Sequence, residues 1–153
     1  MKKIATILTV CALGLVFVSG ALCEERASKK DATDMVKKAV AAFKQKGEKA
    51  FVEFTAPSKT FTLKDLYVVA YDTTGKCLAH GQNAKLVGNS LIELKDADGK
   101  EFVKERVELV KTKDNFWQEY KFTDPLTKRI LPKEAYCEKA NATTIICGGV
   151  YKD

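Results

Sequence analysis

Residues that build most catalytic and metal sites are scarce in this sequence. Only one of its 153 residues is a histidine, His80, and the motifs of phosphate-binding loops, zinc proteases, serine hydrolases and haem attachment are all missing. A metal site would have to combine His80 with a thiolate and carboxylates that have no recognisable spacing. The sequence therefore predicts no catalytic residue, no metal and no cofactor, and we do not expect an enzyme.

Arginine is scarce too. It occurs only at positions 26, 106 and 129, whereas lysine is interleaved with glutamate and aspartate along the chain. A nucleic-acid footprint needs clustered lysine and arginine. The formal charge of +6 is therefore expected to be spread over a solvated surface, and nucleic acid is not a predicted partner.

Long apolar runs are missing everywhere except at the start of the chain. Residues 1–3 are basic at two positions, residues 4–18 are apolar, and small residues lead up to Cys23, which is the order of a secretory signal peptide. We predict cleavage after Cys23, with Ala21 as the alternative point. An uncleaved membrane anchor is a further alternative, because the apolar run is only slightly shorter than a bilayer-spanning helix.

Cleavage of a signal peptide at residues 1–23 would place the mature chain in the periplasm or outside the cell. Removal of 23 of the 153 residues leaves 130, and the loss of two lysines lowers the formal charge from +6 to +4. Residues 24–32 are charged and lack an apolar pattern, so we expect a flexible lead-in there. Residues 33–153 then form a single domain.

Hydrophobic periodicity predicts an α+β fold. Val36, Val40 and Phe43 recur at helical spacing, and residues 65–72 are rich in β-branched and aromatic side chains, as buried strands are. The order of helix, two strands, helix and three strands indicates a five-stranded antiparallel sheet with helices against one face. The helices are expected at residues 31–46, 49–54 and 96–111, and the strands at 65–72, 76–80, 115–122, 130–139 and 143–151.

Caps and loops complete this expected arrangement. Asp31 or Thr33 is expected to cap the first helix, and Asp96 or Asp98 the helix that ends near residue 111. Residues 81–95 have no periodic pattern. Long ordered loops in small domains are often functional, so we expect this one to contribute to a site.

Three cysteines remain after the predicted cleavage: Cys77, Cys137 and Cys147. If the last two strands form a hairpin that turns near Asn141 and Ala142, Cys137 and Cys147 lie opposite each other, and export would place them in an oxidising compartment. A cross-strand disulfide is our hypothesis, with two free thiols as its alternative. Cys77 is expected to be a small buried apolar residue.

Motifs in both halves of the chain are similar to those of one family. Taken together, over residues 33–152, they resemble the single Cache domain, type 2. The residues that carry the resemblance are Asp65–Asp72, Gly75, Cys77–His80, Leu86–Gly88, Leu94–Lys100, Phe102, Val103, Trp117, Tyr120, Phe122, Pro125, Thr127, Pro132, Lys133, Tyr136 and Gly149–Tyr151.

The resemblance implies a PAS-like fold, in which a long N-terminal helix accompanies a five-stranded antiparallel sheet with a further helix between the strands at 76–80 and 115–122. It also implies an extracytoplasmic sensor of small molecules, of the kind found in chemoreceptors and sensor kinases. Because the sequence ends directly after the last predicted strand, we expect a free-standing exported form that acts with a separate membrane receptor or sensor kinase. The oligomeric state is not predicted.

A small ligand needs a concave pocket with aromatic walls and a few convergent polar groups. Lys133 would supply charge to a small carboxylate, while His80 and a tyrosine hydroxyl would donate hydrogen bonds. Core packing is the alternative for every candidate, most of all for Trp117, which strand alternation puts opposite Tyr120 and Phe122. The candidate ligand-binding residues are Tyr67, Tyr71, His80, Trp117, Tyr120, Phe122, Lys133 and Tyr136.

The sequence thus predicts an exported, non-enzymatic sensor module for a small molecule, and a small organic acid is the favoured ligand. Amines and neutral amides are alternative ligands, because they could use the aromatic faces and the tyrosine oxygens. The alternative function is a structural or protein-interaction module, a degenerate Cache fold whose pocket is filled by its own side chains.

Overall fold

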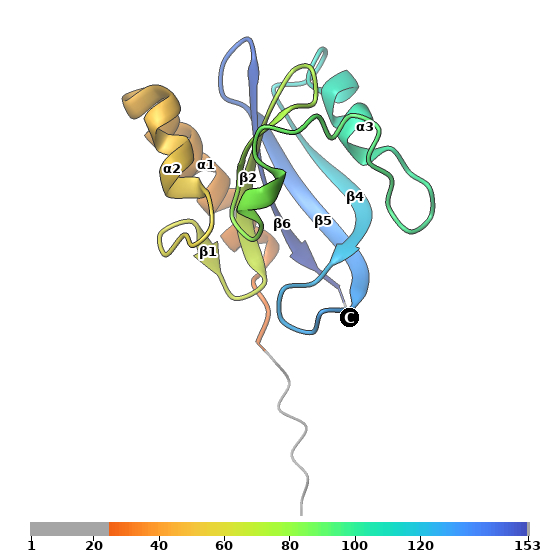
Figure 1. Cartoon of the computed structure of the whole chain (residues 1–153). Helices are drawn as coiled ribbons and strands as arrows, with labels where there is room; N and C mark the ends of the chain where they lie inside the picture. The colour runs from red at the N-terminus through yellow and green to blue at the C-terminus, as the bar shows by residue number, and fades with distance from the viewer. Residues whose placement is uncertain (1–24, 153) are drawn as a thin grey trace, which may run out of the picture.

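The computed structural model describes residues 25–152 of the chain. The predicted signal peptide at residues 1–23 lies outside these residues. Within residues 25–152, no helix combines the length and the apolar character that a membrane crossing requires. These residues fold around one antiparallel sheet, as predicted, with the start of the described chain and its C-terminus at the same end of the molecule (Figure 1).

Helix α1, Lys29–Lys46, starts two residues earlier than predicted. Its cap is Ser28 rather than Asp31 or Thr33. The Ser28 hydroxyl oxygen accepts from the backbone N–H of Asp31, and the Asp31 carboxylate accepts from the backbone N–H of Ser28. This reciprocal capping box satisfies two backbone donors at once. The helix ends at Gly47, whose φ of 61° suits a residue without a side chain.

Residues 25–28, expected to be a flexible lead-in, pack against the sheet. Ala27 is buried, and its backbone N–H donates to the Asp65 carboxylate at 2.7 Å. This segment is therefore held by contacts with residues that are distant in sequence, and a local sequence pattern cannot reveal such contacts.

The sheet has the strand order β1-β2-β6-β5-β4, and β3 also pairs with β2. All of these pairs are antiparallel. Five strands agree with the predicted ones to within a residue or two, while β1 is an addition that is too short to give a sequence pattern. The strands are β1 Thr62–Leu63, β2 Leu66–Asp72, β3 Cys77–His80, β4 Asn115–Thr123, β5 Ile130–Lys139 and β6 Thr144–Tyr151.

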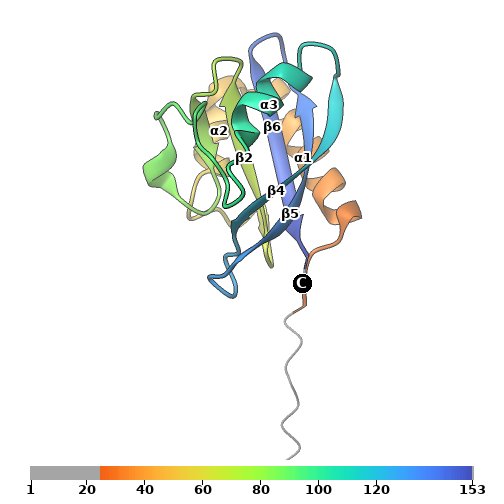
Figure 2. The ribbon, with the colours of Figure 1, turned by 90° about the vertical axis from the view of Figure 1, so that its right-hand side faces the viewer.

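Helices cover both faces of the sheet, which corrects the prediction of helices against one face. Helix α1 and the short helix α2, Ala50–Phe54, share one apolar cluster with the sheet, whereas helix α3, Phe102–Leu109, belongs to a cluster on the opposite face (Figure 2). The reason is visible in β2, where every residue from Leu66 to Tyr71 is buried. A strand that is apolar on both sides needs a cover on both sides. Two single 3₁₀ turns, Gly47–Lys49 and Ala84–Leu86, complete the helical segments.

Helix α3 starts at Phe102, well after the predicted start near residue 96. The Asp96 carboxylate is occupied elsewhere, because it accepts from the backbone N–H groups of Asp98 and Lys100 within its own turn and from that of Lys121 on β4. Asp96 therefore fastens a turn to the sheet instead of capping a helix.

Cys137 and Cys147 are register partners in the β5–β6 hairpin, and a disulfide joins them. Cys77 is the free cysteine of the described residues, and it is buried. Burial raises the pKa of its thiol to about 11. Cys77 therefore acts as an inert apolar group at neutral pH.

Candidate functional site

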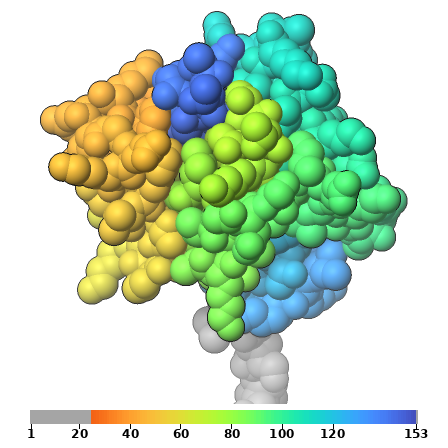
Figure 3. Space-filling view, turned by 45° about the horizontal axis from the view of Figure 1, so that its top comes forward, coloured from red at the N-terminus to blue at the C-terminus, as the bar shows by residue number. Residues whose placement is uncertain are grey.

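A cavity of about 300 Å³ opens on the face of the sheet that α3 covers. Its walls come from β2, from the end of β3 with the loop that follows, and from the end of β4 with the loop that leads to β5. The segment after β3, drawn in green in Figure 3, lies at the surface between the first two helices and the α3 region. The lining residues are Tyr67, His80, Gln82, Asn83, Leu86, Phe122, Thr123, Asp124, Pro125 and Lys128.

Lys133 lies against this aromatic wall and is 3% exposed. Its Nζ atom is 3.7 Å from the ring centroid of Tyr67 and 4.5 Å from that of Tyr151. Burial lowers the pKa of Lys133 well below its usual value. An anion beside Nζ would oppose that shift, because a neighbouring negative charge favours the ammonium form.

Tyr151, on the last strand, connects Lys133 to the rim of the cavity. Its hydroxyl donates to the carbonyl of Thr123 at 2.7 Å, and its oxygen accepts from Nζ of Lys133 at 3.2 Å. The hydroxyl of Tyr67, 3.1 Å away, is then a second donor to that oxygen. Gly149 leaves room for the lysine, since a methyl group there would lie 2.7 Å from Cε of Lys133.

His80 ends β3 with its ring fixed by the chain that follows. Its Nδ1 accepts from the backbone N–H groups of Gln82 and Asn83, at 3.2 and 3.1 Å, so Nε2 is the protonated nitrogen. Burial is the largest cause that lowers the pKa of His80 to about 4, followed by the charges of Lys133 and Arg106. At neutral pH, His80 therefore offers the cavity a hydrogen-bond donor and no charge.

This depressed pKa predicts a pH dependence of stability. Between pH 6.5 and 4 the unfolded chain binds a proton at His80 and the folded chain does not, so a fall in pH favours unfolding by up to about 3 kcal/mol. His80→Asn keeps an acceptor for the two N–H groups but cannot titrate. We expect urea unfolding to show the wild type losing stability relative to this variant as the pH falls through that window. A constant difference between the two proteins would contradict the depressed pKa.

Arg106 on α3 is fully buried and was not predicted as a site residue. Its guanidinium lies 5.1, 5.7 and 5.4 Å from the ring centroids of Tyr71, Phe102 and Tyr120. Its Nε donates to the side-chain oxygen of Gln118 at 3.1 Å. Both terminal nitrogens are buried without a well-aligned hydrogen bond in the part of the chain that the structure describes, and the hydroxyls of Tyr71 and Tyr120 are the polar groups that stabilise the charge.

Unpaired donors on a buried charged group are costly, and folded proteins keep few of them. A guanidinium with two open terminal nitrogens has the geometry to bind a carboxylate through two hydrogen bonds. The charges of Lys133 and Arg106 both lower the pKa of His80, so the three basic side chains influence one another across this face of the sheet. The arrangement is therefore suited to a small anion.

The structure brings most of the predicted site residues to one face of the sheet. Some line the cavity, Lys133 lies against its wall, and two tyrosines flank Arg106. Phe122 connects the two groups, since its ring centroid is 5.9 Å from that of Phe102 and 6.0 Å from Nζ of Lys133. The predicted residues on this face are Tyr67, Tyr71, His80, Tyr120, Phe122 and Lys133.

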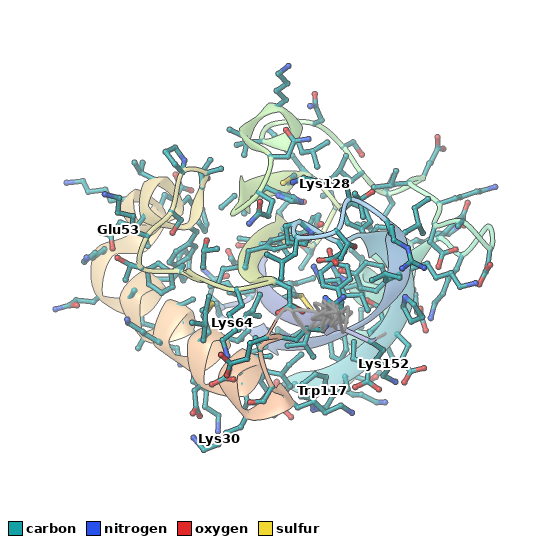
Figure 4. The ribbon with its side chains drawn as sticks, turned by 90° about the horizontal axis from the view of Figure 1, so that it is seen from below. Lys30, Glu53, Lys64, Trp117, Lys128 and Lys152 are labelled. Carbon is teal, nitrogen blue, oxygen red and sulfur yellow. A yellow bond between two sulfur atoms is a disulfide. The ribbon has the colours of Figure 1, made fainter. Side chains whose placement is uncertain are left out.

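Trp117 and Tyr136 do not join this cavity, which corrects their place in the predicted site. They are register partners on β4 and β5, with ring centroids 5.3 Å apart, and Tyr136 belongs to the apolar cluster under α1. Trp117 is 39% exposed, with Nζ of Lys29 5.1 Å from its ring. Figure 4 shows Trp117 beside the start of α1 and Lys128 on the opposite side of the sheet. Strand alternation alone accounts for this placement.

The sequence profile of one family, Single Cache domain 2, matches residues 12–153. The chain belongs to this family. Cache domains are sensor and ligand-binding modules that work outside the cytoplasm. Among curated proteins, the comparison found no match for this Cache domain.

Solved structures with this fold include three chemotaxis or chemosensory proteins. A methyl-accepting chemotaxis protein from Vibrio parahaemolyticus is 22% identical, with a TM-score of 0.70 over 82% of this chain and 88% of the other. A Cache chemosensory domain described for carboxylic acid recognition is 24% identical, with a TM-score of 0.69 over 81% and 92%. The periplasmic sensor domain of a chemotaxis protein is 20% identical, with a TM-score of 0.62 over 81% and 90%. These likenesses establish the fold of this Cache domain.

Proposed function

We propose that this protein is an exported Cache sensor module that binds a small carboxylate and acts with a separate membrane receptor or sensor kinase. Family membership supports the sensory role. The segment at residues 1–23, with its basic start and apolar run, supports export to the periplasm. The module performs no chemistry on its ligand, and its residues serve only to bind and orient it.

The observation that carries the choice of ligand is Arg106. Its two terminal nitrogens are buried and form no ion pair with a carboxylate in the described chain; the polar groups beside them are the hydroxyls of Tyr71 and Tyr120. A carboxylate would supply an acceptor to each nitrogen. The pKa of Lys133, which burial depresses, would rise beside the same anion. One solved relative of this fold is described for carboxylic acid recognition, which supports the same ligand class.

The size of the cavity restricts the ligand. About 300 Å³ is at the lower end of the volumes of small-molecule sites. Tyr67 and Phe122 line the cavity and contact Lys133, whereas Lys133 and Arg106 do not line it, so a bulky acid would have to displace more aromatic surface than a short one to reach them. We therefore propose an acid of a few carbon atoms.

A thermal-shift titration against matched acids and amides tests this proposal. Acetate, propionate, pyruvate and succinate are compared with acetamide and propionamide, which have nearly the same shape and no charge. A ligand that binds only the folded state raises the melting temperature with concentration, and 100 times the dissociation constant is worth about 2.7 kcal/mol. We expect a rise with at least one of the short acids and none with its amide.

The result can also decide against the proposal. If acids and amides raise the melting temperature equally, the cationic groups do not select the ligand. If no compound raises it, the interior is filled by its own aromatic side chains, and a structural or protein-interaction role on the Cache fold takes the place of sensing.

A further inference from the structure

The segment before α1 is fastened to the sheet by a buried ionic contact. The Arg26 guanidinium donates to the Asp124 carboxylate through both terminal nitrogens at 3.3 Å and to the Asp65 carboxylate at 3.5 Å. Both aspartate side chains are fully buried, and the arginine side chain is 13% exposed. The next residue, Ala27, donates its N–H to the same Asp65. We call residues 25–28 the N-terminal arm.

Asp124 belongs to the wall of the cavity as well as to this contact. Its carboxylate accepts from the backbone N–H groups of Leu126 and Thr127 and from the Thr127 hydroxyl. The shape of the loop at residues 123–129 therefore depends on the carboxylate that holds Arg26.

Asp65 connects the N-terminal arm to the interior by a second route. One carboxylate oxygen accepts from Ala27, and the other accepts from the backbone N–H of Tyr151 at 3.1 Å. The Tyr151 hydroxyl in turn contacts Lys133 and the Thr123 carbonyl. Two independent paths thus lead from the arm to the groups around the cavity.

We propose that occupancy of the cavity and seating of the N-terminal arm are coupled through Arg26, Asp65 and Asp124. The ligand part of this coupling rests on the proposed binding of a small carboxylate. A ligand that contacts residues 123–129 orders this loop and holds Asp124 in place for Arg26, so the arm is held more firmly. The reverse effect follows by thermodynamic reciprocity.

The N-terminal arm lies at the end of the domain where the described chain begins. The end of β6 lies at the same end of the molecule (Figure 1). A change in the cavity is therefore passed to the end of the domain where the chain enters and leaves.

The first test needs no ligand. In the full exported chain, Arg26→Ala is expected to speed amide hydrogen exchange in residues 123–129 at least about fivefold, because the loop loses the partner of its central carboxylate. Lys30→Ala is the matched control: it also removes one positive charge near the arm, but within residues 25–152 the ion pair of Lys30 is with the exposed Asp34. Exchange in the loop that is the same in both variants and the wild type overturns the proposal.

The second test uses propionate as the ligand, followed by calorimetry. We expect Arg26→Ala to bind it at least about fivefold more weakly than the wild type, and Lys30→Ala to bind it with unchanged affinity. In the wild type, saturating propionate should slow hydrogen exchange at residues 27–28. Arg26→Lys keeps the charge but not the two-pronged contact, and it replaces Arg26→Ala in this test if the alanine variant does not fold. Its affinity for propionate should lie between those of the wild type and Arg26→Ala.

The two tests separate the coupling from the proposed function. Equal propionate affinity in the wild type and both Arg26 variants overturns the coupling while leaving carboxylate binding intact. If the wild type binds none of the acids, the proposed function fails, and the loop exchange in the first test then decides alone whether the N-terminal arm and the cavity wall act as one unit.

Discussion

Replacing Arg106 with methionine is expected to weaken carboxylate binding strongly and to raise the stability of the ligand-free protein. The two effects share one cause. The guanidinium is fully buried and has no carboxylate partner in the described residues. The hydroxyls of Tyr71 and Tyr120 compensate only part of the free-energy cost of burying the charge, and an anion would compensate the rest. Methionine has a similar length and can pack between Tyr71, Phe102 and Tyr120, whose rings now surround the charge.

The sizes of the two effects follow from the contacts that change. Loss of a two-pronged charged contact to a desolvated carboxylate should weaken binding about 100-fold or more. Stability should rise by about 1 kcal/mol, because the relief of the buried charge is partly offset by the lost hydrogen bond to Gln118. Calorimetric titration and urea unfolding measure the two quantities separately.

Lys104→Met is the matched control for this experiment. Lys104 lies on the same helix, is exposed, and loses the same charge. We expect it to change neither binding nor stability by much, since exposed charge contacts are worth little. If Arg106→Met destabilised the empty protein by several kcal/mol and left binding intact, Arg106 would be a structural residue and not part of the ligand site.

Much of the sheet could be predicted because strand pairing follows simple rules. The hairpin turn near Asn141 places Cys137 opposite Cys147 once the turn is located, and the structure has this register. The placement of Trp117 away from Tyr120 follows from alternation along β4 in the same way. The prediction that Trp117 belongs to the pocket disregarded this alternation, which places it correctly on the other face.

Arg106 escaped prediction for a different reason. It lies on α3 between Val103 and Val107, two buried residues of the apolar stripe, so helical spacing already placed it on the buried face. A long basic side chain at such a position usually extends to the surface. Only the aromatic rings that meet around it from β2 and β4 keep it inside, and such long-range packing has no local signature.

The N-terminal arm and the start of α3 were also mispredicted because their contacts are with residues distant in sequence. Asp65 and Asp96 both look like ordinary turn or cap residues in the sequence. In the structure Asp65 holds Ala27 and Tyr151, and Asp96 holds Lys121 on β4. A single carboxylate can satisfy several distant backbone donors, and the choice among them is made by the fold as a whole.

Gly149→Ala is expected to destabilise the protein by about 3 kcal/mol, through crowding in the centre of the sheet. An added methyl group would lie 2.7 Å from Cε of Lys133, 2.9 Å from the carbonyl oxygen of Glu134 and 3.1 Å from Cα of Ala135. The lysine side chain can move, but the two backbone atoms belong to β5 and cannot move without disturbing the sheet. Urea unfolding measures the loss.

Gly148→Ala, one residue earlier on β6, is a control of the same chemistry on the other face. Its methyl group would meet side-chain ends at 3.1 Å on Val36 and 3.3 Å on Leu66, and backbone only at 3.7 Å. Side-chain ends can yield by a few tenths of an ångström, so we expect a loss of about 1 kcal/mol or less. If the two variants lose equal stability, crowding against the backbone of β5 is not the reason for a glycine at position 149. If Gly149→Ala is the more damaging and also weakens propionate binding, the glycine serves the fold and the position of Lys133 together.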